Sequence, residues 1–145
     1  RSRGCDELFI VTPDRKGLFA RCTALIDRLH LNILEARIHT TDDGLAFNSF
    51  FVLERDGSHI PEGFRREEVI GSIRQGLVAE QMPAVQPRPL SKRLQQFARK
   101  SEITFVQDLE NHCTRLRVQS IDRPGLLSLI AQVLAEEELR VLQAK

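Results

Sequence analysis

The chain of 145 residues is long enough for one ordinary domain or two small ones, and too short for a large multidomain enzyme. Its 21 Lys and Arg residues nearly balance 20 Asp and Glu residues, which excludes a protein whose whole surface attracts polyanions. No apolar stretch approaches the roughly 20 residues of a membrane span, so we expect no membrane partner. Three cysteines at unrelated spacings favour a reducing compartment, and we expect a cytoplasmic protein. Arg at position 1, with no leader after it, indicates a piece of a longer chain.

Hydrophobic patterning divides the first half of the chain into short elements. The apolar run before Pro13 suits a strand, because proline cannot extend a sheet ladder. Beyond Gly17 the apolar residues recur at helical spacing, and an Asp-Asp-Gly turn at 42–44 separates two later runs. These patterns predict a strand over 7–12, a helix over 17–29, strands over 33–41 and 45–53, and a helix over 65–79.

The second half begins with a proline-rich, basic stretch. Three prolines between 83 and 89 predict a stiff extended linker, and the basic residues over 88–100 are more typical of a solvated face than of a contact surface. We expect residues 102–107 to supply the last strand of a first βαββαβ unit, an antiparallel sheet with helices on one face. The remaining pattern predicts a strand over 114–121, a helix over 126–135 and the start of a strand over 140–145.

The chain contains an internal repeat with an offset of 108 residues between positions 14 and 122. The sequence DRKGLF at 14–19 recurs as DRPGLL at 122–127, and ILEAR at 33–37 recurs as VLQAK at 141–145 without a gap. One supersecondary unit is therefore used twice. The expected organisation is a first domain at 6–82 with its last strand at 102–107, a linker at 83–101, and a second domain at 108–145 that is truncated after its helix.

These motifs resemble a known family. A strand, Asp-Arg-x-Gly-Leu at a helix start, Leu-Asn-Ile at the next strand and an Asp-Gly hairpin together resemble the ACT domain, an amino-acid-sensing regulatory module. The resemblance implies an α+β, ferredoxin-like βαββαβ fold with an incomplete second copy. The tandem pair, with a Pro/Arg linker and the strand SEITF at 101–105, is similar to the C-terminal region of the bifunctional uridylyltransferases/uridylyl-removing enzymes that act on the nitrogen-regulatory protein PII.

The second resemblance implies a regulatory function. In that family, glutamine binding to these domains is taken to switch the enzyme from attaching UMP to PII toward removing it. Catalysis and its Mg²⁺ would then belong to other domains of the parent enzyme, and we expect no catalytic residue, metal or cofactor in this chain. The expected partners are L-glutamine, the catalytic domains, PII through them, and a second copy of the chain through the sheet edges.

Two features depart from the family pattern. Lys16 stands where the family has proline, whereas Pro124 keeps the pattern, so the first copy has a backbone N–H that the second lacks. The sequence also stops at Lys145, before the second copy completes its hairpin, second helix and last strand. We therefore do not expect the two copies to be equal ligand sites.

The turn before each repeated helix is the candidate binding site. A glycine at a strand-to-helix bend presents unpaired backbone N–H groups and the positive end of the helix, which attract a carboxylate. Asp14 can cap the loop or meet an ammonium group, and Asn32 can pair with a side-chain amide. The candidate ligand-binding residues are Asp14, Arg15, Lys16, Gly17, Leu18, Asn32 and Ile33 in the first copy, and Asp122, Arg123, Gly125 and Leu126 in the second.

Other interpretations stay open at this point. Without the resemblance, a plain tight turn is the favoured explanation of Gly17 and Asp14. RNA-binding modules share the βαββαβ order, but Asp43 stands where their third-strand motif needs a basic residue and Leu45 replaces a stacking aromatic, so we expect no nucleic-acid partner. The four histidines have no metal-ligand spacing. The functional alternatives are an ACT module of another amino-acid enzyme and a ligand-free dimerisation domain.

Overall fold

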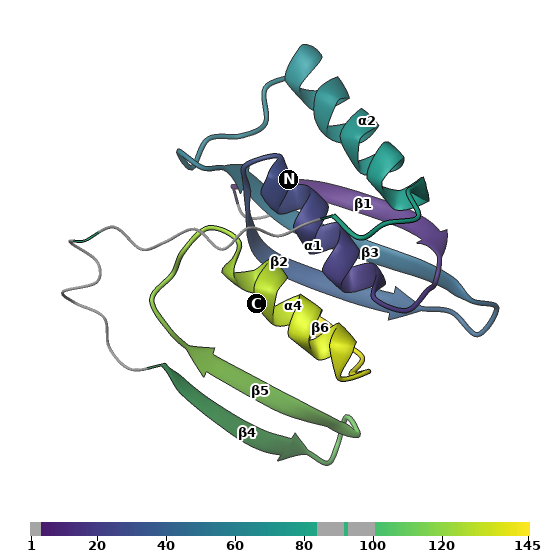
Figure 1. Ribbon diagram of the computed structural model, residues 1–145, viewed down its shortest axis with the longest axis vertical. Coiled ribbons are helices and arrows are strands. Elements are labelled where there is room, and N and C mark those ends of the chain that lie inside the picture. Colours follow the sequence, from purple (N-terminus) through teal and green to yellow (C-terminus); the bar gives the residue numbers. More distant parts are fainter. Residues whose placement is uncertain (1–3, 84–91, 93–100) are drawn as a thin grey trace. The chain divides into compact units, whose positions relative to one another are not determined.

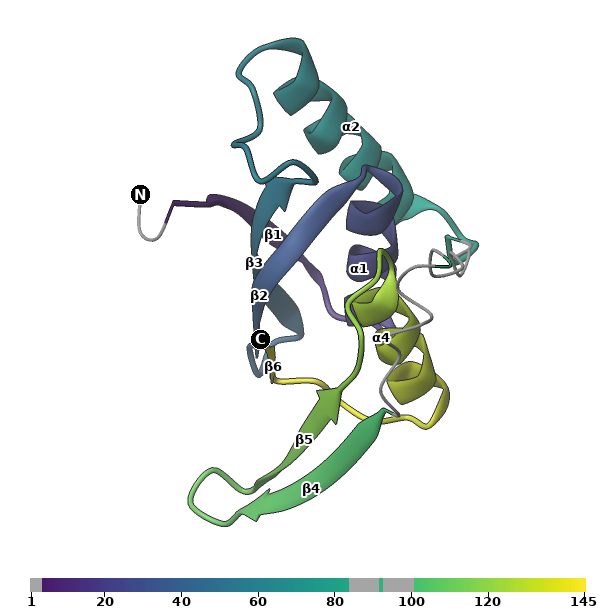
Figure 2. The same ribbon diagram turned by 90° about the vertical axis from the view of Figure 1, so that its left-hand side faces the viewer.

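The computed structural model describes residues 4–83, 92 and 101–145. They form two compact units, one comprising Arg1–Pro87 with Pro124–Lys145 and the other Arg88–Arg123. In the first unit, the three helices lie on one face of a four-stranded sheet (Figures 1 and 2). The α+β class expected from the sequence is therefore confirmed. Among the described helices, none combines the length and the apolar character that crossing a bilayer requires.

The sheet of the first unit has the strand order β1-β3-β2-β6, with every pair antiparallel. Successive side chains point to opposite faces, so Ile10, Ala36 and Phe50 are buried against the helices while Phe9 on the other face is exposed. The bounds are β1 Asp6–Pro13, β2 Leu31–Thr40, β3 Leu45–Glu54 and β6 Gln143–Ala144.

The helices begin and end close to the predicted positions. The bounds are α1 Leu18–Arg28, α2 Phe64–Val78 and α4 Leu126–Glu136. α1 ends where His30 adopts a positive φ of 60° and donates its backbone N–H to the Asp27 carbonyl at 2.9 Å. α2 approaches α1 closely at Gly76, where an added Cβ would lie 2.1 Å from a methyl group of Leu25. α1 packs against β2 of the sheet and lies beside both α2 and α4.

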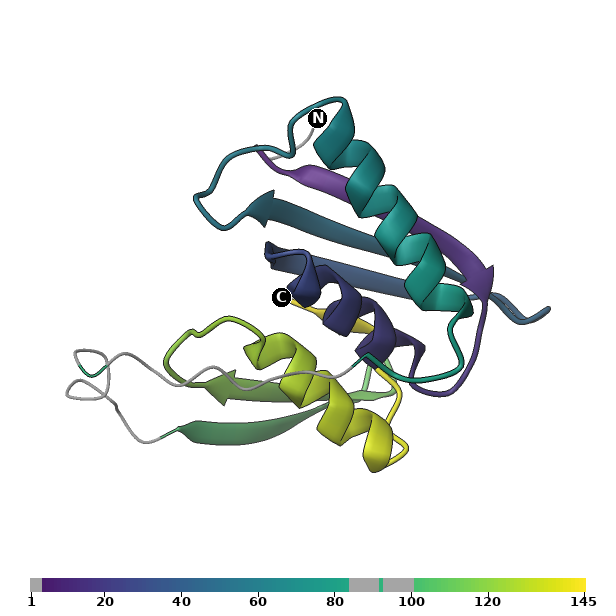
Figure 3. The same cartoon turned by 45° about the horizontal axis from the view of Figure 1, so that its top comes forward.

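The repeat of the sequence is also a repeat in space. α1 and α4, which occupy equivalent positions in the two copies, lie side by side (Figure 3). The equivalent strands β2 and β6 pair antiparallel, and the register places Ala36 opposite Ala144, its counterpart 108 residues later. The second copy's helix and strand are thus related to those of the first by an approximate two-fold axis through this pair.

The second unit contains a β-hairpin, β4 Glu102–Asp108 and β5 Cys113–Gln119. In its turn Asn111 donates to the Asp108 carboxylate from its side chain at 3.0 Å and from its backbone at 3.2 Å, which lowers the pKa of Asp108. The prediction that residues 102–107 supply the last strand of the first sheet is wrong, because this strand pairs with β5 in a separate two-stranded sheet. A four-residue connection closes that hairpin at a lower entropic cost than pairing with a strand far away in the sequence. The expected linker at 83–101 and its basic stretch lie almost wholly outside the described residues.

Candidate ligand-binding site

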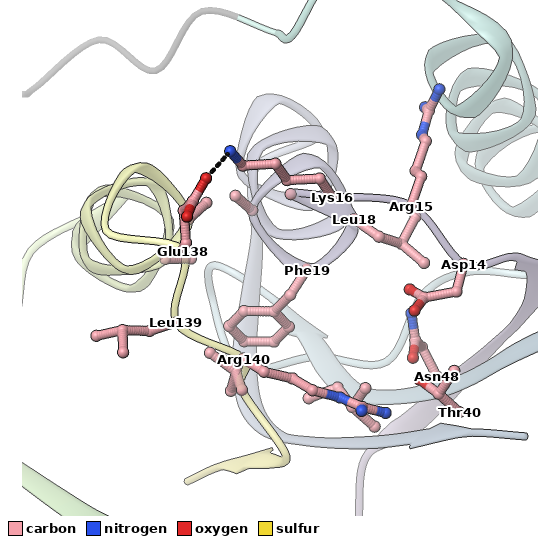
Figure 4. Close-up of a pocket in the computed structure, with 16 residues that line it drawn as sticks. Asp14, Arg15, Lys16, Leu18, Phe19, Thr40, Asn48, Glu138, Leu139 and Arg140 are labelled. Carbon is pink, nitrogen blue, oxygen red and sulfur yellow. Dashed lines mark hydrogen bonds and ion pairs between the residues drawn. The ribbon is translucent and has the colours of Figure 1, made fainter. Parts of the chain in front are cut away.

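A cavity of about 280 Å³ opens in the first unit at the start of α1 (Figure 4). One wall is the turn from β1 into α1, which carries five of the predicted ligand residues: Asp14, Arg15, Lys16, Gly17 and Leu18. The opposite wall comes from α4 and the chain after it, and includes Ala135, Glu138, Leu139, Arg140 and Val141. The cavity therefore lies between the first copy's turn and the second copy's helix end.

The turn leaves backbone donors at the start of α1. Gly17 adopts the left-handed conformation with φ 74° and ψ 14°, and no side chain caps the helix. The backbone N–H of Leu18 donates to the Arg15 carbonyl at 3.1 Å, and the backbone N–H of Arg21 donates to the Gly17 carbonyl at 2.9 Å. The N–H groups between them, on Phe19 and Ala20, belong to cavity-lining residues at the positive end of the helix. Groups of this kind attract an anion.

Two arginines anchor this turn and α1 to the end of α2. Arg15 donates to the Leu77 carbonyl at 2.6 Å. Arg21 is 6% exposed and donates to the carbonyls that close α2, those of Gly76 at 3.0 Å, Ala79 at 2.8 Å, Glu80 at 3.3 Å and Gln81 at 3.0 Å. Burial lowers the pKa of the Arg21 guanidinium, and the nearby positive charge of Arg15 adds to the effect. The carbonyl cage compensates for burying this charge, so the helix start is held rigidly.

An exposed ion pair joins the two walls of the cavity. Lys16 lies 2.7 Å from Glu138, and both side chains are mostly exposed, so the pair contributes at most about 1 kcal/mol. Beneath it, a Cβ added to Gly17 would contact the methyl group of Ala135 at 4.0 Å. The wall that faces the positive end of α1 is thus small and uncharged at this point.

The floor of the cavity contains Asn48, which our reasoning from the sequence missed. Asn48 is 1% exposed, and neither its Oδ1 nor its Nδ2 has a hydrogen-bond partner among the described residues. The neighbouring thiol of Cys22 does not meet hydrogen-bond geometry with Asn48. Burial raises the pKa of this thiol to about 12, and the nearby Asn48 amide opposes that rise. An unpaired buried amide costs about 1–3 kcal/mol. The sequence signal for Asn48 is strand alternation, which places this polar residue on the same inward face as Ala46 and Phe50.

The other predicted ligand residues lie outside this cavity. Asn32 is exposed on β2 and Ile33 packs against the core, and neither lines it. Their repeat equivalents, Arg140 and Val141, do line it. A ligand role for Asn32 and Ile33 stays a prediction.

The second repeated turn has a different neighbour. Gly125 adopts the same left-handed conformation, with φ 80°, at the start of α4 and next to Leu126. A Cβ added to Gly125 would meet the carboxylate of Asp27 at 3.2 Å, so this helix start already faces an anion. Asp122 and Arg123, which precede it, belong to the other compact unit.

The described residues bring together no group of three or more His, Cys, Asp or Glu side chains that would hold a metal ion. The cavity offers backbone donors, charged side chains and one buried amide, which suit reversible binding of a small polar molecule.

Comparison with known proteins agrees with this description. The family model of the ACT domain matches residues 7–70, which include β1, α1, β2, β3 and the first half of α2. Residues 7–70, somewhat less than half of the chain, are therefore similar to an ACT domain. No solved structure matches it significantly.

Several curated relatives of this chain share one name. Bifunctional uridylyltransferase/uridylyl-removing enzymes from Idiomarina loihiensis, Hydrogenovibrio crunogenus and Methylococcus capsulatus are 35%, 34% and 36% identical to it over 142, 146 and 146 residues. The alignments cover 98% or 99% of this chain and 16% of each relative. The chain is therefore similar to one region of these enzymes and spans about one sixth of their length.

Proposed function

We propose that the chain is the amino-acid-sensing regulatory region of a uridylyltransferase/uridylyl-removing enzyme that acts on PII, with glutamine as its ligand. The names of the relatives and the ACT match support the regulatory setting. The activity itself would reside in catalytic domains beyond this chain, which would also contact PII.

The position of the cavity is the observation that carries this proposal. Its two walls come from different copies, the turn at Asp14–Leu18 from the first and the chain at Glu138–Val141 from the second. A ligand held there contacts both copies at once, so it favours the arrangement in which both walls are in place. Such a preference is what couples a binding site to a distant activity.

The chemistry of the walls suits an amino acid. The α-carboxylate is attracted by the Phe19 and Ala20 N–H groups and by Lys16, at the positive end of α1. The carboxylates of Asp14 and Glu138 line the same cavity and can receive the α-ammonium group. A volume of about 280 Å³ is at the lower end for small-molecule sites, as an amino-acid ligand requires.

Calorimetric titration of L-glutamine into this chain tests the proposal, with glutamate and leucine as comparison ligands. Because the sequence lacks Trp and Tyr, the protein concentration is set by peptide-bond absorbance. We expect glutamine to bind, and to bind more tightly than either comparison ligand. Absence of any heat of binding with all three amino acids would contradict the proposal.

The repeat supplies a matched pair of variants for this titration. Gly17→Ala and Gly125→Ala each place a Cβ on a left-handed residue, at φ 74° and 80°, and should strain the backbone by similar amounts. Only Gly17 lines the cavity. We expect Gly17→Ala to weaken glutamine binding and Gly125→Ala to retain it, with circular dichroism confirming that both variants fold. Equal losses in both variants would argue against this cavity.

A further inference from the structure

Asn48 has chemistry that the fold does not use. It lies in the middle of β3, where its cross-strand neighbours Ile10 and Ile38 have no polar side-chain atoms. Both polar atoms of its amide are covered from solvent and lack a hydrogen-bond partner among the described residues. An apolar residue would fill this inward position without that cost.

The amide also lies where a ligand would be held. Asn48 lines the same cavity as the uncapped start of α1, which supplies the donors for an α-carboxylate. In Figure 4 the Asp14 carboxylate points toward the Asn48 amide. A carboxylate only accepts hydrogen bonds, so it can satisfy Nδ2 but leaves Oδ1 unpaired. A group that satisfies both atoms must donate and accept.

We infer that Asn48 selects ligands that carry a terminal carboxamide, by pairing its Nδ2 and Oδ1 with the carbonyl and the NH₂ of that group. This inference rests on the proposed amino-acid site. The ligand reaches the covered amide when an exposed lining side chain moves, and Asp14, which is exposed and points toward Asn48, is that side chain.

The same geometry rejects the two closest alternatives to a carboxamide. A ligand carboxylate accepts from Nδ2 but brings a second negative oxygen against Oδ1, and it also approaches the Asp14 carboxylate. An aliphatic side chain fills the space and leaves both atoms of Asn48 unpaired. A site built on buried hydrogen-bonding groups discriminates strongly against ligands that cannot pair with them.

The test compares L-glutamine, L-glutamate and L-norleucine, which keeps the chain length but lacks the amide, in calorimetric titrations of the wild type and Asn48→Leu. Leucine is close in size and has no donor or acceptor. Ser49→Ala, on the opposite face of β3, is the matched control. We expect the wild type and Ser49→Ala to prefer glutamine over norleucine by at least about tenfold, and Asn48→Leu to lose that preference.

The outcomes separate this inference from the proposed function. If the wild type binds glutamine and Asn48→Leu keeps the full preference, the selecting role is wrong and sensing stands. If the wild type binds the three ligands equally, selection by Asn48 is also wrong. If it binds none of them, both proposals fail.

A second measurement does not depend on the folding of the variant. In the wild type labelled with ¹⁵N, we expect the Asn48 side-chain NH₂ resonances to shift on addition of glutamine and to stay in place with norleucine. An unchanged Asn48 amide at saturating glutamine would overturn the inference.

Discussion

The two repeated turns have the same backbone and different surroundings. Gly17 and Gly125 both take the left-handed conformation, each one residue before a helix that no side chain caps. The first helix start faces the apolar side chains of Met82 and Ala135 and an open cavity, whereas the second faces the carboxylate of Asp27. Ala135 and Asp27 are themselves equivalent positions, 108 residues apart.

This difference separates what the local sequence determines from what the partner copy determines. The Asp-Arg-x-Gly-Leu sequence produces the turn and its backbone donors in both copies, because glycine adopts a positive φ without strain. Whether those donors are free depends on the residue that the other copy places against them. In the second turn that residue is an acid, which supplies the negative charge favoured at a helix N-terminus. We therefore expect the first turn to be the better ligand site.

The largest effect is expected from removing the anchor of the first turn. The repeat equivalent of Arg21 is Leu129, so Arg21→Leu makes α1 resemble α4. The change leaves the carbonyls that close α2 without their donor, and we expect a loss of about 2–4 kcal/mol in the free energy of unfolding. Urea denaturation followed by circular dichroism measures it. A loss below about 1 kcal/mol would mean that the carbonyl cage contributes little.

The second prediction makes the first turn's surroundings like those of the second. Ala135→Asp places a carboxylate opposite the start of α1, where it competes with the α-carboxylate of a ligand. We expect glutamine affinity to fall at least about tenfold, or about 1.4 kcal/mol, in calorimetry. Val133→Asp adds the same charge at an exposed position of α4 and is the control. Equal affinities in the two variants would contradict the proposed role of Ala135.

The third prediction concerns the thiol beneath the first turn. Burial raises the pKa of Cys22 from 9.0 to about 12, so above pH 9 the unfolded chain releases this proton while the folded chain retains it. Stability should therefore fall as the pH rises from 9 toward 12. We expect the wild type to lose roughly 1 kcal/mol relative to Cys22→Val between pH 7 and pH 10. Parallel denaturation curves for the two proteins across this range would show that the thiol is not shielded.

The smallest effect is expected at Lys16, whose equivalent is Pro124. Lys16→Pro copies the second turn into the first and removes the exposed pair with Glu138. Because exposed pairs contribute little, we expect stability to change by less than about 1 kcal/mol at physiological salt. Thermal denaturation of Lys16→Pro and Lys16→Met measures it. A large loss of stability in Lys16→Pro but not in Lys16→Met would show that the two turns differ in backbone conformation.

Most elements of the fold could be predicted because their patterns are local. The helices expected over 17–29, 65–79 and 126–135 are found at Leu18–Arg28, Phe64–Val78 and Leu126–Glu136, since apolar periodicity records which face is buried. Strand pairing is not local. The pattern of residues 102–107 indicates a strand but not its neighbour, and the nearest strand in the sequence is the one it pairs with.

Only the part of the candidate site that a single copy forms could be predicted from the sequence. The turn at 14–18 followed from its motif. No local pattern indicates which copy supplies the strand start that faces this turn. Asn32 and Ile33 belong to the strand start of the same copy. The residues that line the cavity, Arg140 and Val141, belong to the equivalent strand start of the other copy. Asn48 was predictable in principle from strand alternation, because it stands at an inward-facing position between Ala46 and Phe50.

A titration of ¹⁵N-labelled protein with L-glutamine distinguishes binding at the first turn from binding at the second. Phe19 and Ala20 have repeat equivalents Leu127 and Ser128, which serve as internal controls in the same spectrum. We expect the backbone amide resonances of Phe19 and Ala20 to shift as glutamine saturates the site, and those of Leu127 and Ser128 to move much less. Equal shifts at both helix starts, or shifts at α4 alone, would contradict it.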